Sequence, residues 1–154
     1  MKKLLGIVVL GLLLSGNAYS KNLHGTNDFS LVVRHSGECG GQNYINDLKT
    51  SAKYILGNTK ININDAYSFD AEQLSINILT AASTTICASH IEIETYHNDS
   101  IQNSAGYRYF GRHISYNRSA VQLSGPPSEH KKHILDQVEL MLKDFVVEWM
   151  EAQK

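Results

Sequence analysis

The chain has 154 residues, with 15 acidic and 14 basic side chains, a formal net charge of −1 and two cysteines. This charge balance excludes a general nucleic-acid binder, which normally carries a strongly basic face. The sequence contains no Gly-x-Ser-x-Gly elbow, phosphate-binding Walker loop, dinucleotide fingerprint or His-Glu-x-x-His motif. No cofactor is therefore predicted, and no catalytic residue can be named from sequence motifs.

The N-terminus has the pattern of a secretory signal peptide. Basic residues 2–3 precede the apolar run Leu4–Leu14, and Ala18-Tyr19-Ser20 places small residues at the positions that a signal peptidase recognises. The apolar run is well below the roughly 20 residues that a membrane-spanning helix needs. We expect residues 1–20 to be removed, leaving a mature chain that begins at Lys21, carries a net charge of about −3 and is periplasmic or secreted, with no membrane span.

The mature chain is predicted to form a flexible N-terminus at 21–27 and a single domain at 28–154. Apolar and β-branched residues predict a strand at 29–35, and helical spacing from residue 42 predicts a helix that ends at Gly57-Asn58. Alternating apolar residues predict strands around 61–63, 74–78 and 84–96. A polar turn is expected at 98–105, followed by one bent strand or a hairpin at 107–123.

A long amphipathic helix is predicted to close the chain. Gly125-Pro126-Pro127 ends the sheet, and Ser128 is the expected N-cap of a helix that runs to about Ala152. Its apolar stripe consists of Ile134, Val138, Met141, Leu142, Phe145 and Trp149. The prediction is an α+β fold of order β-α-β-β-β-β-α, in which one early helix and this long helix pack on a mainly antiparallel sheet.

Cys39 and Cys87 are the only cysteines, so in an oxidising compartment their simplest state is a disulfide. Closing a loop of about 48 residues stabilises a fold by roughly 4 kcal/mol in the chain-entropy model. Two alternatives remain open: a nucleophile pair of Cys87 with His90, and a redox role for Cys39 beside its glycines.

Two pairs of residues are candidate metal ligands. His90 and Glu92 are two apart on a predicted strand and therefore share a face, where they could hold a metal or exchange a proton. His130 and His133 are three apart at the start of the last helix and also share a face. For His90 and Glu92 the alternative is a solvent-exposed strand face that pairs with basic side chains on a neighbouring strand. For His130 and His133 the alternative is a solvent-exposed first turn of the helix. No metal ligand is assigned.

The segment around residues 107–113 is a candidate ligand or partner surface, because it alternates aromatic and basic side chains. In an extended strand, Arg108, Phe110, Arg112, Ile114 and Tyr116 would share one face. Arginine beside aromatic rings suits an anionic or glycan-like ligand, although these arginines could instead pair with Glu92 and Glu94 across the sheet. The candidate surface comprises Tyr107, Arg108, Tyr109, Arg112 and His113.

The layout of signal peptide, early strand and helix, central strands, Gly125-Pro126-Pro127 break and closing helix with Val138, Phe145 and Trp149 resembles that of small envelope proteins of proteobacteria. The resemblance implies an envelope compartment and transfers no activity. We therefore expect an exported, non-catalytic binding or envelope-assembly protein whose partner is an envelope component or an anionic ligand. The alternatives are a small secreted hydrolase and a metal-binding protein.

Overall fold

The computed structural model describes residues 23–37, 39, 43–68, 71–125 and 127–154, so the expected signal peptide and its cleavage site lie outside the described residues. The elements in chain order are β1 (Asp28–Ser36), α2 (Asn43–Gly57), β2 (Asn62–Asn64), β3 (Glu72–Ala82), β4 (Cys87–Gln102), β5 (Arg108–Ser124) and α3 (Pro127–Ala152). This is the predicted α+β order. No helix in the described residues is long and apolar enough to cross a membrane.

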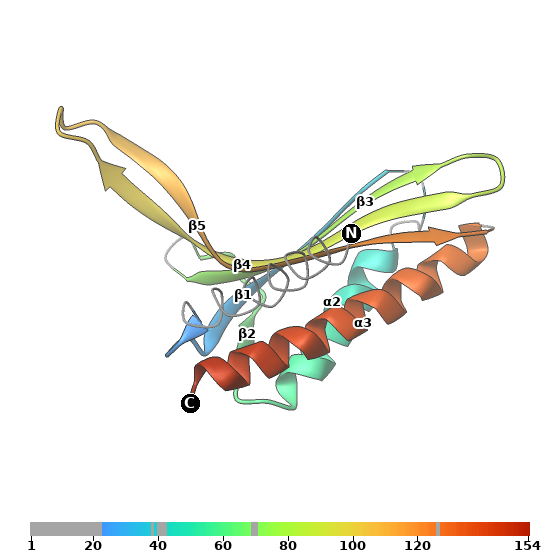
Figure 1. The fold of residues 1–154 in the computed structure, drawn as a ribbon, viewed down its shortest axis with the longest axis horizontal. Helices are drawn as coiled ribbons and strands as arrows, with labels where there is room; N and C mark the ends of the chain where they lie inside the picture. Colours follow the sequence, from blue (N-terminus) through green and yellow to red (C-terminus); the bar gives the residue numbers. More distant parts are fainter. Residues whose placement is uncertain (1–22, 38, 40–42, 69–70, 126) are drawn as a thin grey trace, which may run out of the picture.

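The strands form one mixed sheet in the order β2-β1-β3-β4-β5. β1 pairs in parallel with β2 and with β3. Parallel pairing requires a crossover connection, and helix α2 lies in the connection that follows β1. The β3–β4 and β4–β5 pairs are antiparallel and contain the longest strands. β4 and β5 extend beyond the rest of the sheet as a two-stranded arm (Figure 1).

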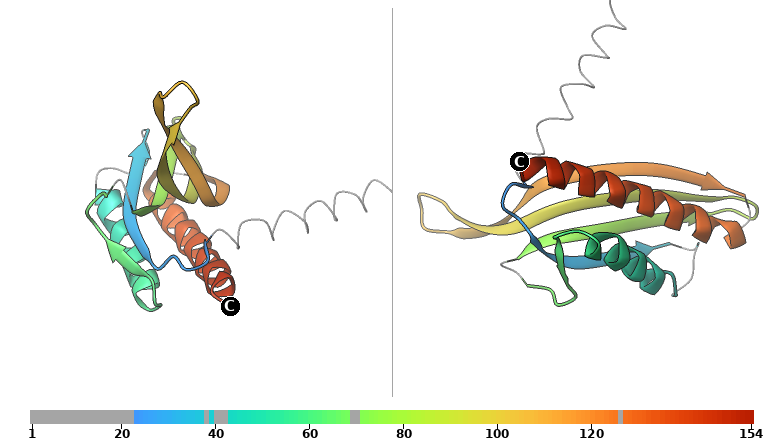
Figure 2. Two further views of the ribbon diagram at one scale, coloured as in Figure 1. Left: turned by 90° about the vertical axis from the view of Figure 1, so that its left-hand side faces the viewer. Right: turned by 90° about the horizontal axis from the view of Figure 1, so that it is seen from below.

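Both helices lie on the same face of the sheet (Figure 2). The apolar stripes predicted for the two helices are buried, including Leu48 of α2 and Phe145 of α3, and they pack against sheet residues such as Ile91. Each such side chain contributes about 1.5–3 kcal/mol when it is fully buried. In the described part of the chain the opposite face of the sheet has no helix over it. The β4–β5 arm bends away from the helices, whereas the other end of β5 lies close to the start of α3 (Figure 1).

Two predicted boundaries are wrong in detail. β4 continues to Gln102, so the turn is tighter than the predicted 98–105, because the Asn103 side chain accepts hydrogen bonds from the backbone amides of Ala105 and Tyr107. Helix α3 begins at Pro127, which places Ser128 within the first turn and not at the N-cap.

A register shift in β5 changes which side chains share a face. Thr95 pairs with Tyr116 and Tyr96 pairs with Ile114, so Ser115 is an extra residue in β5. Tyr116 therefore turns to the helix side and is buried, whereas Ile114 is exposed. The expectation that Tyr116 shares a face with Arg112 and Ile114 is wrong for this reason.

The start of the described chain is bonded to the end of α3. The Trp149 indole N–H donates to the Thr26 carbonyl at 2.6 Å, and the Gln153 side chain donates to the Leu23 carbonyl at 2.8 Å. Leu23 itself belongs to the core. Residues 23–27, the described part of the segment expected to be flexible, are therefore held by tertiary contacts.

Candidate functional site

The helix-free face of the sheet carries a connected polar network at its centre. Glu94 is only 3% exposed although neither α2 nor α3 covers this face. Its Oε1 atom accepts a hydrogen bond from Asn77 Nδ2 at 3.1 Å and another from the Arg112 guanidinium. The Arg112 Cζ atom lies 3.5 Å from the centroid of the Tyr96 ring, a cation–π geometry. The charges of Glu94 and Arg112 are thus paired within the protein, and both side chains are fixed in place.

The same face is apolar toward the end where β3 joins β4. Leu79, Val121 and Leu123 are 59%, 71% and 66% exposed. The register aligns Leu79, His90 and Val121 across three strands. His90 therefore lies between apolar neighbours, while Glu92 accepts a hydrogen bond from Asn117 Nδ2 at 2.9 Å. The predicted His90 and Glu92 pair is not brought into a set of metal ligands.

The aromatic and basic segment lies on the β4–β5 arm. Tyr107 is in the turn and is 70% exposed, and Arg108 is exposed opposite Gln102. Arg112 makes the Glu94 ion pair that the sequence offered as the alternative to ligand binding, and His113 lies beside His97. The side chain of Tyr109 lies outside the described part of the structure.

Cys39 and Cys87 form the predicted disulfide, with 6.3 Å between their Cα atoms. Because both sulfur atoms are bonded, Cys87 is not a free nucleophile for His90. Thr80 positions the Cys39 loop: its Oγ1 accepts a hydrogen bond from the Cys39 amide at 3.2 Å. Gly37, with φ of 109°, lies so close to Thr80 that a Cβ atom would be 1.9 Å from the Thr80 carbonyl oxygen.

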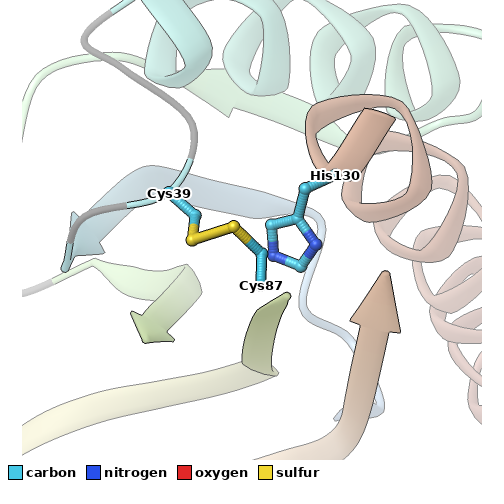
Figure 3. Close-up of side chains that lie close together, drawn as sticks. All are labelled: Cys39, Cys87 and His130. Atoms are coloured by element: carbon cyan, nitrogen blue, oxygen red, sulfur yellow. A yellow bond between two sulfur atoms is a disulfide. The ribbon is translucent and has the colours of Figure 1, made fainter. Parts of the chain in front are cut away.

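His130 lies beside the disulfide and is completely buried (Figure 3). Its Nε2 and Nδ1 atoms are each 2.5 Å from a serine hydroxyl, that of Ser89 and that of Ser124. Burial lowers the pKa of His130, and the nearby His133 lowers it further. This keeps the imidazole neutral, so one nitrogen donates and the other accepts.

With the disulfide formed, the described residues around His130 do not present a converging set of metal ligands or an exposed nucleophile. His133 is exposed whereas His130 is buried, so the predicted histidine pair does not converge. The ligand atoms of Cys39, Cys87 and His130 lie within 4.8 Å of one another, but the disulfide occupies both sulfur atoms. Ser89 and His130 resemble a nucleophile and base, yet both are buried, so a substrate cannot reach the Ser89 hydroxyl in this arrangement.

A second polar cluster, which the sequence did not reveal, lies where the arm leaves the sheet. His97 Nδ1 is 3.3 Å from Glu72 Oε2, and His97 Nε2 is 3.0 Å from Asp99 Oδ2. The His97 and His113 rings lie 5.0 Å apart between centroids. Burial raises the pKa of Glu72, against the opposing effects of the Ser115 hydroxyl and then of His97 and His113. A shallow hollow that Glu72 and His97 line with Asp28 makes the cluster accessible to solvent.

Comparison with known protein families and with curated proteins gives no significant match. Among solved structures, the chain is similar to a minor lipoprotein from Acinetobacter baumannii, with 10% sequence identity and a TM-score of 0.35 over 79% of this chain and 89% of the lipoprotein. No functional assignment follows from a similarity at this level.

Proposed function

We propose that this chain is an exported, non-catalytic protein that binds an extended, acidic segment of an envelope partner along the free edge of β5. The expected signal peptide and the disulfide support export, since disulfides persist in oxidising compartments. The binding proposal rests on the geometry of β5.

The observation that carries the proposal is the unprotected edge of β5. In the described part of the chain β5 pairs with β4 alone, which leaves one edge of a 17-residue strand without a neighbour. Exposed edges are normally protected by charges, prolines or short length. Residues 119–124 contain neither a charge nor a proline, and they include the exposed Val121 and Leu123. Such an edge favours the addition of a further strand.

Charge indicates which kind of segment would bind. No acidic residue occurs between Asp99 and Glu129, whereas this stretch contains Arg108, Arg112 and Arg118. Arg112 is paired with Glu94, and Arg118 is paired with Glu148. Arg108 and the exposed Tyr107, at the tip of the β4–β5 arm, are therefore the groups best placed to meet an acidic partner. A second copy of β5, aligned along its length, would add more positive charge and no acidic residue, which disfavours self-pairing.

The test is a binding assay with fluorescent peptides of about 16 residues, long enough at roughly 3.3 Å per residue to lie along β5 from Arg108 to Leu123. A peptide of alternating valine and glutamate is expected to bind at least tenfold more tightly than one of alternating valine and lysine. A central proline should abolish binding, because it removes a backbone donor.

Two variants locate the interaction. Val121→Glu with Leu123→Glu should weaken binding of the acidic peptide at least tenfold, because it removes the apolar contacts and places like charges opposite the peptide. Leu140→Glu with Val147→Glu, at exposed positions of α3, should leave binding unchanged. Equal binding of the two peptides, or equal loss in both variants, would overturn the proposal. So would a wild-type dimer in sedimentation analysis that becomes monomeric in the β5 variant, since the edge would then serve self-association.

A further inference from the structure

A row of three potential metal ligands crosses the sheet at the base of the β4–β5 arm. Glu72 begins β3, His97 lies on β4, and His113 pairs directly with His97 from β5. All three project to the helix side, because Glu72 is two residues from the buried Leu74 and His97 is two residues from the buried Thr95. Side chains on adjacent strands at one level of a sheet are close enough to share a ligand.

From this row we propose that Glu72, His97 and His113 bind a divalent transition-metal ion of the zinc class, with a water molecule in the remaining position. The proposal is independent of partner binding at β5. Zinc in proteins prefers imidazole nitrogen and carboxylate oxygen in a tetrahedral arrangement.

The spacing of Glu72 and His97 fits one tetrahedral ion, and His113 must rotate to bring a nitrogen to it. Two donor atoms at about 2.0–2.1 Å from zinc lie about 3.3 Å apart, and the centres of two imidazoles bound to it lie about 5 Å apart. The observed separations are 3.3 Å from His97 Nδ1 to Glu72 Oε2, and 5.0 Å between the His97 and His113 centroids. His113 is exposed and can rotate to complete the set.

Asp99 occupies the position of a supporting residue. Histidines that bind metals commonly donate their second ring N–H to a carboxylate, which fixes the tautomer and the ring orientation. The contact of 3.0 Å from His97 Nε2 to Asp99 Oδ2 has this form. With Nε2 bonded to Asp99, the His97 Nδ1 atom faces Glu72. Any proton on Nδ1 would be released to solvent when the ion binds.

Glu72 provides an independent reason to expect a cation. Its Oε1 atom is buried and has no hydrogen-bond partner among the described residues. A buried carboxylate oxygen without a partner costs free energy, and a bound cation would remove that cost. Neither the ion pair with His97 nor the nearby Ser115 hydroxyl gives this oxygen a hydrogen bond of acceptable geometry.

The test uses the mature protein with its disulfide intact, stripped of metal by a chelator and titrated with Zn²⁺ in a calorimeter. We expect one ion per chain. Titration with Co²⁺ should give the visible absorption bands of a four-coordinate nitrogen and oxygen site. Glu72→Gln, His97→Gln and His113→Gln should each weaken Zn²⁺ binding at least tenfold, and Asp99→Asn should weaken it about tenfold through the orientation of His97.

The matched controls are His90→Gln and His133→Gln, which remove exposed histidines elsewhere and should leave the affinity unchanged. His113→Gln keeps the test decisive if His97→Gln does not fold, because the His113 side chain is exposed. Absence of Zn²⁺ binding, or an affinity that His113→Gln and Glu72→Gln leave unchanged, would overturn the proposal. Binding that appears only after reduction would also overturn it, since Cys39, Cys87 and His130 would then be the ligands.

Discussion

Replacing Gly37 with alanine tests how closely the end of β1 is packed against β3. At Gly37 the backbone has φ of 109°, a value that costs an L-residue roughly 1–2 kcal/mol. The added Cβ would also lie 1.9 Å from the Thr80 carbonyl oxygen and 2.5 Å from Thr80 Oγ1. These atoms must separate by more than 1 Å, which displaces the loop that carries Cys39.

The displacement breaks hydrogen bonds that Thr80 Oγ1 makes with this loop. Thr80 Oγ1 accepts a hydrogen bond from the Cys39 amide at 3.2 Å and lies 3.3 Å from the Cys39 carbonyl oxygen. Each lost bond costs about 0.5–1.5 kcal/mol. Together with the backbone strain, the free energy of unfolding should fall by about 3 kcal/mol in Gly37→Ala.

Urea denaturation of the oxidised protein measures this change, and two other glycines serve as controls. Gly25 has φ of 77° but nothing within 4 Å of an added Cβ, so Gly25→Ala should lose only the backbone cost of about 1 kcal/mol. Gly57 has open space and ordinary φ, so Gly57→Ala should be neutral or slightly stabilising. A Gly37→Ala variant no less stable than Gly25→Ala would refute the packing argument.

Three further predictions follow from other parts of the molecule. Cys39→Ala with Cys87→Ala should lower the free energy of unfolding by about 2–5 kcal/mol in urea titration, and a loss below about 1 kcal/mol would contradict a stabilising role for the disulfide. The lowered pKa of His130 means that the unfolded chain takes up its proton first as pH falls through about 6.5, so stability should decrease there by up to about 1.4 kcal/mol per pH unit. Urea denaturation at pH 7 and pH 5 should show this loss of unfolding free energy in wild type and in His90→Gln but not in His130→Gln. If His130→Gln loses as much stability between the two pH values as wild type, another group causes the pH dependence. Intact-mass analysis of exported protein should give a chain that begins at Lys21, whereas a species that retains Met1 in the membrane fraction would contradict cleavage.

Elements whose pattern repeats along the chain were predictable from the sequence. The α3 stripe from Ile134 to Trp149 is buried as its helical spacing indicates, and Ile91 and Ile93 are buried on β4 as strict alternation indicates. The disulfide was predictable because the chain has two cysteines and its N-terminal pattern indicates export to an oxidising compartment. Each of these inferences depends on local spacing or on counting.

Features that depend on how strands align could not be predicted. Nothing in the sequence places β1 between β2 and β3, and the extra residue Ser115 reverses the facing of Tyr116. The row of Glu72, His97 and His113 requires the register of three strands. Of the three, the sequence singled out only His113, because it belongs to the aromatic and basic segment at 107–113. The hydrogen bond that satisfies the buried His130 ring likewise comes from Ser89, which is distant in the sequence.

The bonds between residues 23–26 and the end of α3 set the order in which folding can finish. They join positions 123 to 130 residues apart in the chain. A ribosome releases the first partner long before the second, so these bonds cannot form until α3 has been synthesised. Contacts this far apart slow folding, because the intervening chain must be ordered first. Residues 23–26 and the end of α3 therefore become ordered together.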